Sequence, residues 1–131
     1  MSDTLVELIG VTKTYERGAS NVRALTDVSL TVAEGEMVVL LGPSGSGKTT
    51  LLNVVGAIET VTSGQVSVSG IDVPLLAGRE LDAYRRNQVG FVFQFFNLVP
   101  TLTARENVEV IAELGGPSAG RRSDEALAQV G

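Results

Sequence analysis

The chain of 131 residues is long enough for one domain with a hydrophobic core, and its 44% hydrophobic and 19% charged residues are typical of a globular protein rather than a disordered one. A net charge of -5 argues against partners that are recognised by neutralising phosphate charge, so we expect no nucleic-acid binding. The sequence contains no cysteine and no histidine, which excludes disulfides, thiolate metal sites and imidazole catalysis by these residues.

The beginning of the chain does not predict a targeting segment. The residues MSDTLVELIG lack the basic and apolar segments of a signal peptide. The longest apolar run, residues 37–41, is far shorter than the roughly 20 residues that a membrane-spanning helix needs. We therefore expect a cytoplasmic chain.

The first part of the chain predicts strands that lead into a helix. Residues 5–11 (LVELIGV) and 25–32 (LTDVSLTV) alternate apolar and polar side chains as half-buried strands do, with a loop predicted at residues 16–21 (ERGASN). The run MVVLL at residues 37–41 predicts a strand that is covered on both faces in a parallel sheet. A helix is predicted after residue 47, because apolar residues follow helical spacing there: Leu51, Leu52, Val54, Val55 and Ile58.

The second part of the chain predicts mostly helices. Short strands are predicted at residues 63–70 (SGQVSVSG) and 90–93 (GFVF), with a weaker helix at about 78–87 between them. Thr103 is followed three residues later by Glu106, which is a capping-box pattern and predicts a helix to about residue 114. A loop at residues 115–120 and a final short helix from about residue 124 complete the prediction.

One short motif carries chemistry. Residues 42–50 (GPSGSGKTT) contain the complete P-loop pattern Gly-x4-Gly-Lys-Thr, between a predicted strand and a predicted helix. Glycines let backbone N–H groups turn toward a polyphosphate, and a helix N-terminus adds partial positive charge. An ordinary glycine-rich turn is the weaker alternative. The pattern predicts a nucleotide site that is formed by Gly42, Pro43, Ser44, Gly45, Ser46, Gly47, Lys48, Thr49 and Thr50.

The P-loop also predicts individual roles. Lys48 is expected to reach the β- and γ-phosphates, and the Thr49 hydroxyl is expected to ligate Mg²⁺. A GTPase is not expected, because no Asn-Lys-x-Asp motif is present. A small-molecule kinase is disfavoured, because the only paired basic residues that could form its lid are Arg85 with Arg86 and Arg121 with Arg122.

Longer stretches resemble the ATPase subunits of ABC transporters. The matching stretches are residues 25–53, 62–72 (TSGQVSVSGID) and 90–108 (GFVFQFFNLVPTLTARENV), and the last is most similar to the branch for lipoprotein release and macrolide export. The resemblance covers essentially the whole chain. It implies an α/β fold: a partial P-loop NTPase core with an N-terminal antiparallel β subdomain and the start of a helical subdomain. We expect one apparently truncated domain over residues 1–131, divided into 1–94 and 95–131.

The resemblance also implies roles for residues outside the P-loop. Tyr15 matches the family's A-loop aromatic residue, which stacks on adenine; the alternative is a core or edge-strand tyrosine. Gln94 matches the Q-loop glutamine, which contacts Mg²⁺ or the attacking water, so Lys48 and Gln94 are the candidate catalytic residues. An apolar cluster after Gln94 lies near the family's groove for a helix of the transmembrane subunit, or alternatively fills the core: Phe95, Phe96, Leu98 and Val99.

The implied function is that of an ATP- and Mg²⁺-binding subunit that couples ATP binding and hydrolysis to export or extraction of a substrate by membrane subunits. The implied partners are transmembrane permease subunits and a second ATPase subunit, on the cytoplasmic face of the cell membrane. The family's signature motif, Walker B aspartate, catalytic glutamate and switch histidine are not found in this sequence. We therefore expect ATP binding without hydrolysis by this chain alone; the alternative is a non-hydrolysing regulatory module. Because the sheet is expected to lack its later strands, an unpaired, exposed apolar edge is expected beside residues 37–41 or 90–93.

Overall fold

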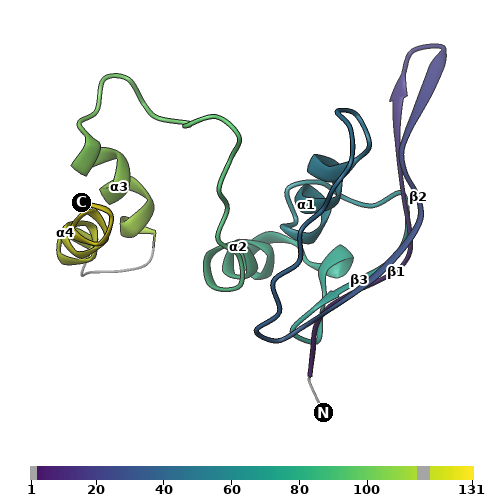
Figure 1. The fold of residues 1–131 in the computed structure, drawn as a ribbon, viewed down its shortest axis with the longest axis horizontal. Helices are drawn as coiled ribbons and strands as arrows, with labels where there is room; N and C mark the ends of the chain where they lie inside the picture. Colours follow the sequence, from purple (N-terminus) through teal and green to yellow (C-terminus); the bar gives the residue numbers. More distant parts are fainter. Residues whose placement is uncertain (1–2, 115–118) are drawn as a thin grey trace. The chain divides into compact units, whose positions relative to one another are not determined.

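The computed structural model describes residues 3–114 and 119–131 and divides the chain into two compact units, Met1–Arg85 and Arg86–Gly131 (Figure 1). Each unit is described by itself. The division expected from the sequence, with a boundary after Gln94, remains a prediction. None of the helices in the described part of the chain has both the length and the apolar character needed to cross a membrane.

The first unit is built on an antiparallel sheet with the strand order β2-β1-β3-β4. Its strands are β1 (Thr4–Arg17), β2 (Ser20–Ala33), β3 (Ser63–Val68) and β4 (Ile71–Asp72). The predicted strands at 5–11, 25–32 and 63–70 are therefore confirmed, as is the antiparallel β subdomain near the N-terminus.

The loop predicted at residues 16–21 is wrong in its length. β1 and β2 continue toward each other until Arg17 pairs with Ser20, so that only two residues form the turn. Gly18 adopts a φ of +59°, which a residue without a Cβ reaches at little cost. The polar residues at the tip interrupt the apolar alternation but still pair along the backbone, because a ladder needs only N–H and C=O groups.

Helix α1 (Lys48–Val55) provides the second layer of the first unit, and it packs against β2 and β3. Leu51 and Val54 point into the core, whereas Leu52 and Ile58 are exposed. The sheet contributes five buried side chains to the same core: Leu8, Val11, Leu25, Val66 and Val68.

A short helical turn and helix α2 complete the first unit and extend just beyond it. The turn η1 (Val73–Leu75) precedes α2 (Gly78–Asn87), which confirms the predicted helix. Tyr84 of α2 is only 3% exposed, and its hydroxyl donates a hydrogen bond to the carbonyl oxygen of Val55. The end of α1 is thereby connected to α2.

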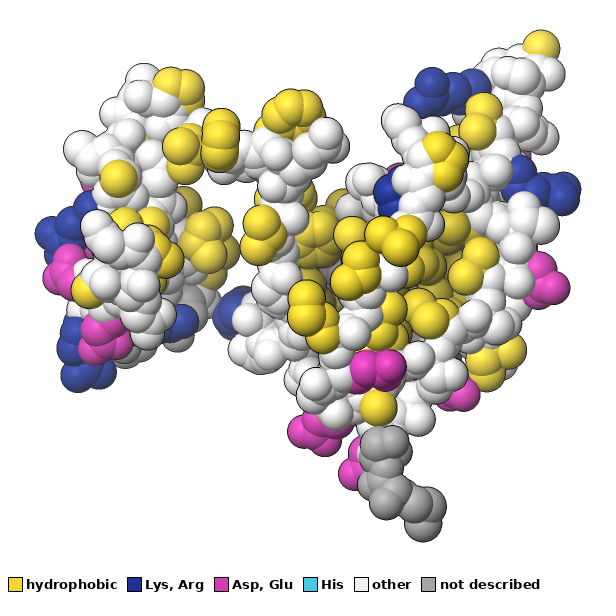
Figure 2. All heavy atoms as spheres, in the orientation of Figure 1, with side chains coloured by type: hydrophobic (Ala, Val, Ile, Leu, Met, Phe, Trp, Pro, Cys, Tyr) yellow, Lys and Arg dark blue, Asp and Glu magenta, His cyan; other side chains and the backbone are white. Residues whose placement is uncertain are grey.

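The strands predicted at residues 37–41 and 90–93 are wrong. Neither segment pairs with a strand among the described residues, and Met37, Leu41 and Val92 are 89%, 89% and 96% exposed. A strand inside a sheet requires neighbouring strands on both sides, because its backbone N–H and C=O groups need hydrogen-bond partners. Among the described residues, the sheet has β2 and β4 as its outer strands, and neither segment is part of it. Most apolar side chains of the two segments are exposed, as expected, but they lie in irregular segments and not at the edge of a sheet. Figure 2 shows hydrophobic side chains gathered at the surface of the first unit.

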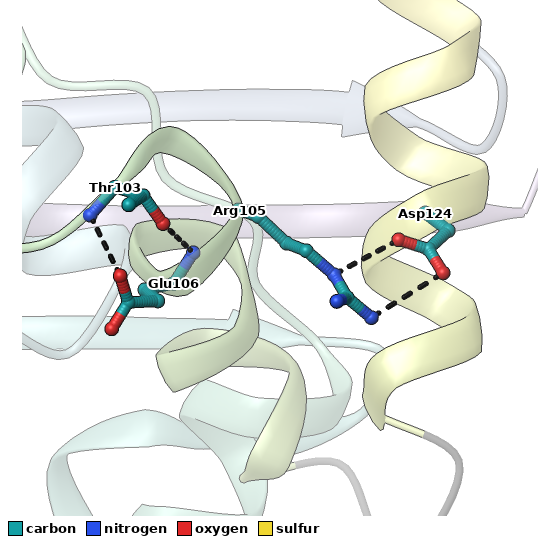
Figure 3. Close-up of polar contacts among 4 residues, drawn as sticks. All are labelled: Thr103, Arg105, Glu106 and Asp124. Carbon is teal, nitrogen blue, oxygen red and sulfur yellow. Dashed lines mark hydrogen bonds and ion pairs between the residues drawn. The ribbon is translucent and has the colours of Figure 1, made fainter.

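The second unit consists mainly of two helices that pack against each other, α3 (Ala104–Glu113) and α4 (Ala119–Val130). The predicted capping box is confirmed: the Glu106 N–H donates to Thr103 Oγ1 at 3.2 Å, and the Thr103 N–H donates to Glu106 Oε1 at 3.1 Å (Figure 3).

Helix α4 begins earlier than expected from the sequence. Residues 119–120 are helical, so this part of the loop prediction is wrong, while residues 115–118 lie outside the described residues. Arg105 of α3 forms an ion pair with Asp124 of α4, with Nε and Oδ1 3.0 Å apart (Figure 3). Packing between the two helices extends α4 over a glycine, Gly120, that by itself favours a loop.

Candidate nucleotide-binding site

The glycine-rich residues 42–47 lead directly into the N-terminus of α1. Gly45 and Gly47 have φ angles of +80° and +98°, a backbone conformation that other residues rarely adopt. A Cβ atom on Gly47 would lie 2.5 Å from the carbonyl oxygen of Ala24, which belongs to β2. Glycine at this position therefore lets the loop pass close to the sheet before the helix begins.

The first turn of α1 offers hydrogen-bond donors and positive potential. The Leu51 N–H donates to the carbonyl oxygen of Gly47 at 2.9 Å, and the N–H groups that precede it in a helix have no intrahelical acceptor. No acidic side chain lies in this turn, so the positive end of the helix dipole is not neutralised locally. Such a helix end is suited to an anion.

The Lys48 ammonium group is folded back over the loop. It donates hydrogen bonds to the carbonyl oxygens of Gly42 and Pro43, the latter at 2.8 Å, and to Ser46 Oγ at 3.1 Å. A Cβ atom on Gly42 would lie 2.7 Å from Ser46 Oγ, so a side chain at residue 42 would displace the Ser46 hydroxyl that accepts from the ammonium.

The contacts of Lys48 are with neutral groups. The ion pairs found among the described residues lie on α3 and α4 and do not involve Lys48. The three oxygens that accept hydrogen bonds from its ammonium group are all uncharged. Phosphate oxygens are stronger acceptors for an ammonium group than carbonyl oxygens, because the hydrogen bond is then assisted by charge on both sides. The donor set therefore fits a polyphosphate.

Tyr15, on β1, lies beside the end of this loop. Its hydroxyl is 3.4 Å from Thr50 Oγ1 and donates to the Glu59 carboxylate, with both carboxylate oxygens at 2.6 Å. The ammonium of Lys13 lies 5.2 Å from the centre of the Tyr15 ring, within cation–π range. Burial, followed by the hydrogen bond to Glu59, raises the pKa of Tyr15 above its ordinary value.

The structure thus brings together Tyr15 and the predicted P-loop residues, including the exposed Thr49 and the half-buried Thr50. It also reveals two residues that the sequence did not predict, Glu59 and Asn53. Glu59 follows α1 and accepts hydrogen bonds from Tyr15 and from Asn53 Nδ2, the latter at 3.4 Å. No local pattern marks this acidic residue, because its partner Tyr15 is 44 positions away.

Gln94 belongs to the second unit, where it is exposed and lies in an irregular segment rather than at the end of a strand. Because the strand predicted at residues 90–93 is absent, Gln94 does not follow a strand, and its contact with Mg²⁺ remains a prediction. The four apolar residues that follow are all exposed, which disfavours the core-filling alternative within the described residues: Phe95, Phe96, Leu98 and Val99.

Comparison with known proteins extends these observations. The family described as ABC transporter matches residues 25–131. The uncharacterized ABC transporter ATP-binding protein MJ0796 of Methanocaldococcus jannaschii is 48% identical over 106 residues, which are 81% of this chain and 45% of that protein. The macrolide export ATP-binding/permease protein MacB of Brucella abortus is 44% identical over 124 residues, which are 95% of this chain and 19% of that protein.

A solved dimeric structure of the ATP-binding cassette MJ0796, in a post-hydrolysis state bound to ADP and Pi, matches with a TM-score of 0.86. The match has 45% sequence identity and covers 95% of this chain and 55% of that chain, which confirms the expected partial P-loop NTPase fold. The chain spans about half the length of MJ0796 and a smaller part of the fused permease protein. Because the family match includes the loop at 42–50 and most of the remaining residues, the chain belongs to the ABC transporter family.

Proposed function

We propose that this chain provides the ATP-binding part of an ABC transporter ATPase, in which ATP binding and hydrolysis drive export of a substrate or its extraction from the membrane. The observation that carries the proposal is the arrangement of Lys48 with uncharged loop oxygens at the N-terminus of α1. Residues 42–46 and Thr49 are exposed, and the donors of this loop are complementary to a triphosphate once Lys48 exchanges its contacts with the loop for contacts with phosphate.

In the proposed complex, backbone N–H groups of residues 42–50 bind the phosphate oxygens, with the exception of Pro43, which has no N–H. Lys48 exchanges its contacts with Gly42 and Pro43 for contacts with the β- and γ-phosphates. Gly45 and Gly47 keep the loop in the conformation that turns its N–H groups inward.

Mg²⁺ is the proposed companion of the nucleotide, and it would neutralise phosphate charge when bound. Thr49 is exposed at the beginning of α1, where its hydroxyl is available as a ligand. Gln94 is the proposed second protein ligand, on the basis of the Q-loop resemblance. Hydroxyl and amide oxygens are suitable for Mg²⁺, which prefers oxygen donors.

Tyr15 is the proposed platform for adenine. Its hydroxyl lies next to Thr50, so the ring stands at the end of the loop that binds the phosphates. Stacking of a base on an aromatic side chain contributes about 1–3 kcal/mol in nucleic-acid complexes.

Hydrolysis is proposed to require groups that this sequence does not supply. The signature motif, Walker B aspartate, catalytic glutamate and switch histidine are not found in the 131 residues, so these residues are expected to bind ATP without turning it over alone. The proposed partners are a second ATPase subunit and transmembrane permease subunits at the cytoplasmic face of the membrane. The dimeric state of the solved MJ0796 structure and the joined ATP-binding and permease functions in the name of MacB support these partners.

The proposal is tested by isothermal titration calorimetry with Mg-ATP. We expect a dissociation constant of roughly micromolar to millimolar, because a few charge-assisted hydrogen bonds are offset by the entropy of association. Lys48→Ala is expected to weaken binding by about 10- to 100-fold, which corresponds to the loss of about 1.5–3 kcal/mol. Arg79→Ala removes the same charge from an exposed position on α2 and is expected to leave binding unchanged.

Equal affinities of the wild-type chain and Lys48→Ala for Mg-ATP would contradict the proposed site. Release of inorganic phosphate is measured in parallel. Steady turnover that Lys48→Ala abolishes would show that these residues already form a complete hydrolytic site, and it would overturn the proposed division between binding and hydrolysis.

A further inference from the structure

A polar network connects β1 to α1 beside the candidate nucleotide site. The Tyr15 hydroxyl donates to the Glu59 carboxylate, which lies 2.6 Å away through either oxygen. Glu59 Oε2 also accepts a hydrogen bond from Asn53 Nδ2 at 3.4 Å, and the Tyr15 hydroxyl is 3.4 Å from Thr50 Oγ1. Asn53 and Thr50 are both residues of α1, so one carboxylate joins the aromatic ring to the helix that begins in the loop.

The backbone after α1 holds Glu59 in this position. The N–H groups of Ile58 and Glu59 both donate to the carbonyl oxygen of Asn53, at 2.8 Å and 3.2 Å. Ala57, just before them, has a φ of +58°, which turns the chain back toward the helix. The carboxylate is therefore supported by its own backbone as well as by two side-chain partners.

We infer that Glu59 is a positioning residue for nucleotide recognition, which holds the Tyr15 ring in the orientation that receives the nucleoside. The inference rests on the proposed function of the loop as a triphosphate site. Glu59 acts only through Tyr15 and touches neither the phosphates nor the metal. A phenol hydroxyl that is bonded to a carboxylate has one preferred direction, so the ring is ordered before the ligand arrives. Ordering a side chain in advance lowers the entropy that binding must overcome.

The chemical class of the ligand follows from this arrangement. The ordered ring provides an apolar face for a flat heterocycle, and the neighbouring loop provides donors for phosphate groups. Inorganic tripolyphosphate uses only the loop, whereas ATP uses the loop and the ring. The ratio of the two affinities therefore reports on Glu59 separately from Lys48.

The test measures dissociation constants of Mg-ATP and Mg-tripolyphosphate by calorimetry for the wild-type chain, Glu59→Ala, Glu59→Gln and Tyr15→Phe. Glu59→Ala and Tyr15→Phe are each expected to weaken ATP binding by about two- to tenfold, the effect of one side chain that is no longer ordered, with tripolyphosphate binding unchanged. Glu59→Gln keeps an oxygen acceptor for the Tyr15 hydroxyl and is expected to restore ATP affinity to within about twofold of the wild type.

A double variant, Glu59→Ala with Tyr15→Phe, separates positioning from general stability. If Glu59 acts through the Tyr15 hydroxyl, the double variant binds ATP no more weakly than either single variant. Additive losses, or equal losses of ATP and tripolyphosphate affinity in Glu59→Ala, would overturn the inference. If Glu59→Ala fails to fold, Tyr15→Phe and Glu59→Gln are compared with the wild type instead. An unchanged ATP affinity in Tyr15→Phe would then overturn the inference that Glu59 positions Tyr15.

Failure of the proposed function gives a different result. In that case the wild-type chain binds neither tripolyphosphate nor ATP, or Lys48→Ala binds both as well as the wild type does. If only the positioning role is wrong, the chain still binds both ATP and tripolyphosphate, and binding of both still depends on Lys48. The ratio of the two affinities in Tyr15→Phe is then the same as in the wild type.

Discussion

Gly47 lies directly against the carbonyl oxygen of Ala24, at a distance that leaves no space for a Cβ atom. This relationship joins the loop of residues 42–47 to strand β2 and defines where α1 begins. The loop that we propose binds phosphate is thus packed against the sheet.

Gly47→Ala is expected to be strongly destabilising. The φ of +98° costs about 1–3 kcal/mol for a residue with a Cβ atom, and the contact of 2.5 Å with Ala24 adds a steric conflict with backbone. Gly35→Ala is the matched control, because Gly35 also has a positive φ, +77°, but a Cβ atom there meets nothing within 4 Å. Urea unfolding should show a larger loss of unfolding free energy for Gly47→Ala than for Gly35→Ala. Equal losses would contradict the close approach of Gly47 to the Ala24 carbonyl oxygen.

Tyr84→Phe tests the connection between α1 and α2. The variant keeps the buried ring but removes the donor to the Val55 carbonyl oxygen, so the free energy of unfolding is expected to fall by about 1 kcal/mol. The measurement is a urea titration followed by circular dichroism. An unchanged midpoint with an unchanged slope would show that this hydrogen bond does not contribute.

The capping box of α3 predicts a dependence on pH. Hydrogen bonds from Thr103, through its side chain and then its backbone, lower the pKa of Glu106. The folded state favours the ionised carboxylate of Glu106, so this carboxylate contributes to the free energy of unfolding. The contribution is complete above the ordinary pKa of a glutamate, about 4.3, and it is lost as the pH falls through the lower pKa that Glu106 has in the folded chain.

A carboxyl-resolved NMR titration measures this shift. Thr103→Ser retains the hydroxyl and should preserve the lowered pKa of Glu106, whereas Thr103→Ala removes the side-chain hydrogen bond, keeps the backbone one, and should move the pKa part of the way back toward the ordinary value. A pKa of Glu106 that is the same in both variants would show that the Thr103 side chain is not its cause.

The exposed apolar segments predict self-association of the chain. Met37 and Leu41 in the first unit, and Val92 and Phe96 in the second, are each at least 89% exposed, and large apolar side chains that are exposed in this way promote association. Sedimentation velocity at increasing protein concentration should show species larger than a monomer, and Met37→Lys with Val92→Lys should reduce them. A single monomeric species at all concentrations would contradict this expectation.

Local patterns were sufficient to predict most elements of the fold. Thr103 and Glu106 are three positions apart, so their capping box depends only on the helix that they begin. Strands β1, β2 and β3 could be predicted because apolar and polar side chains alternate along each of them, as expected for a strand with one buried face. The P-loop was predicted because its glycines, Lys48 and Thr49 are contiguous.

Features that depend on distant residues could not be predicted in this way. A strand at residues 37–41 requires neighbouring strands, and its apolar composition alone does not provide them. The role proposed for Glu59 depends on its hydrogen bond with Tyr15, which lies on another element and comes near Glu59 only in the folded chain. The early start of α4 depends on packing against α3, which outweighs the loop preference of Gly120.

The central claim, that residues 42–50 bind a nucleotide triphosphate, is tested most directly by following the backbone amide resonances of the wild-type chain during titration with Mg-ATP. We expect the largest shifts at Gly45, Gly47, Lys48 and Thr49, saturating with one dissociation constant, and no such shifts in Lys48→Ala at the same concentrations. Resonances of the loop that remain unchanged in the folded wild-type chain at saturating Mg-ATP would contradict the account.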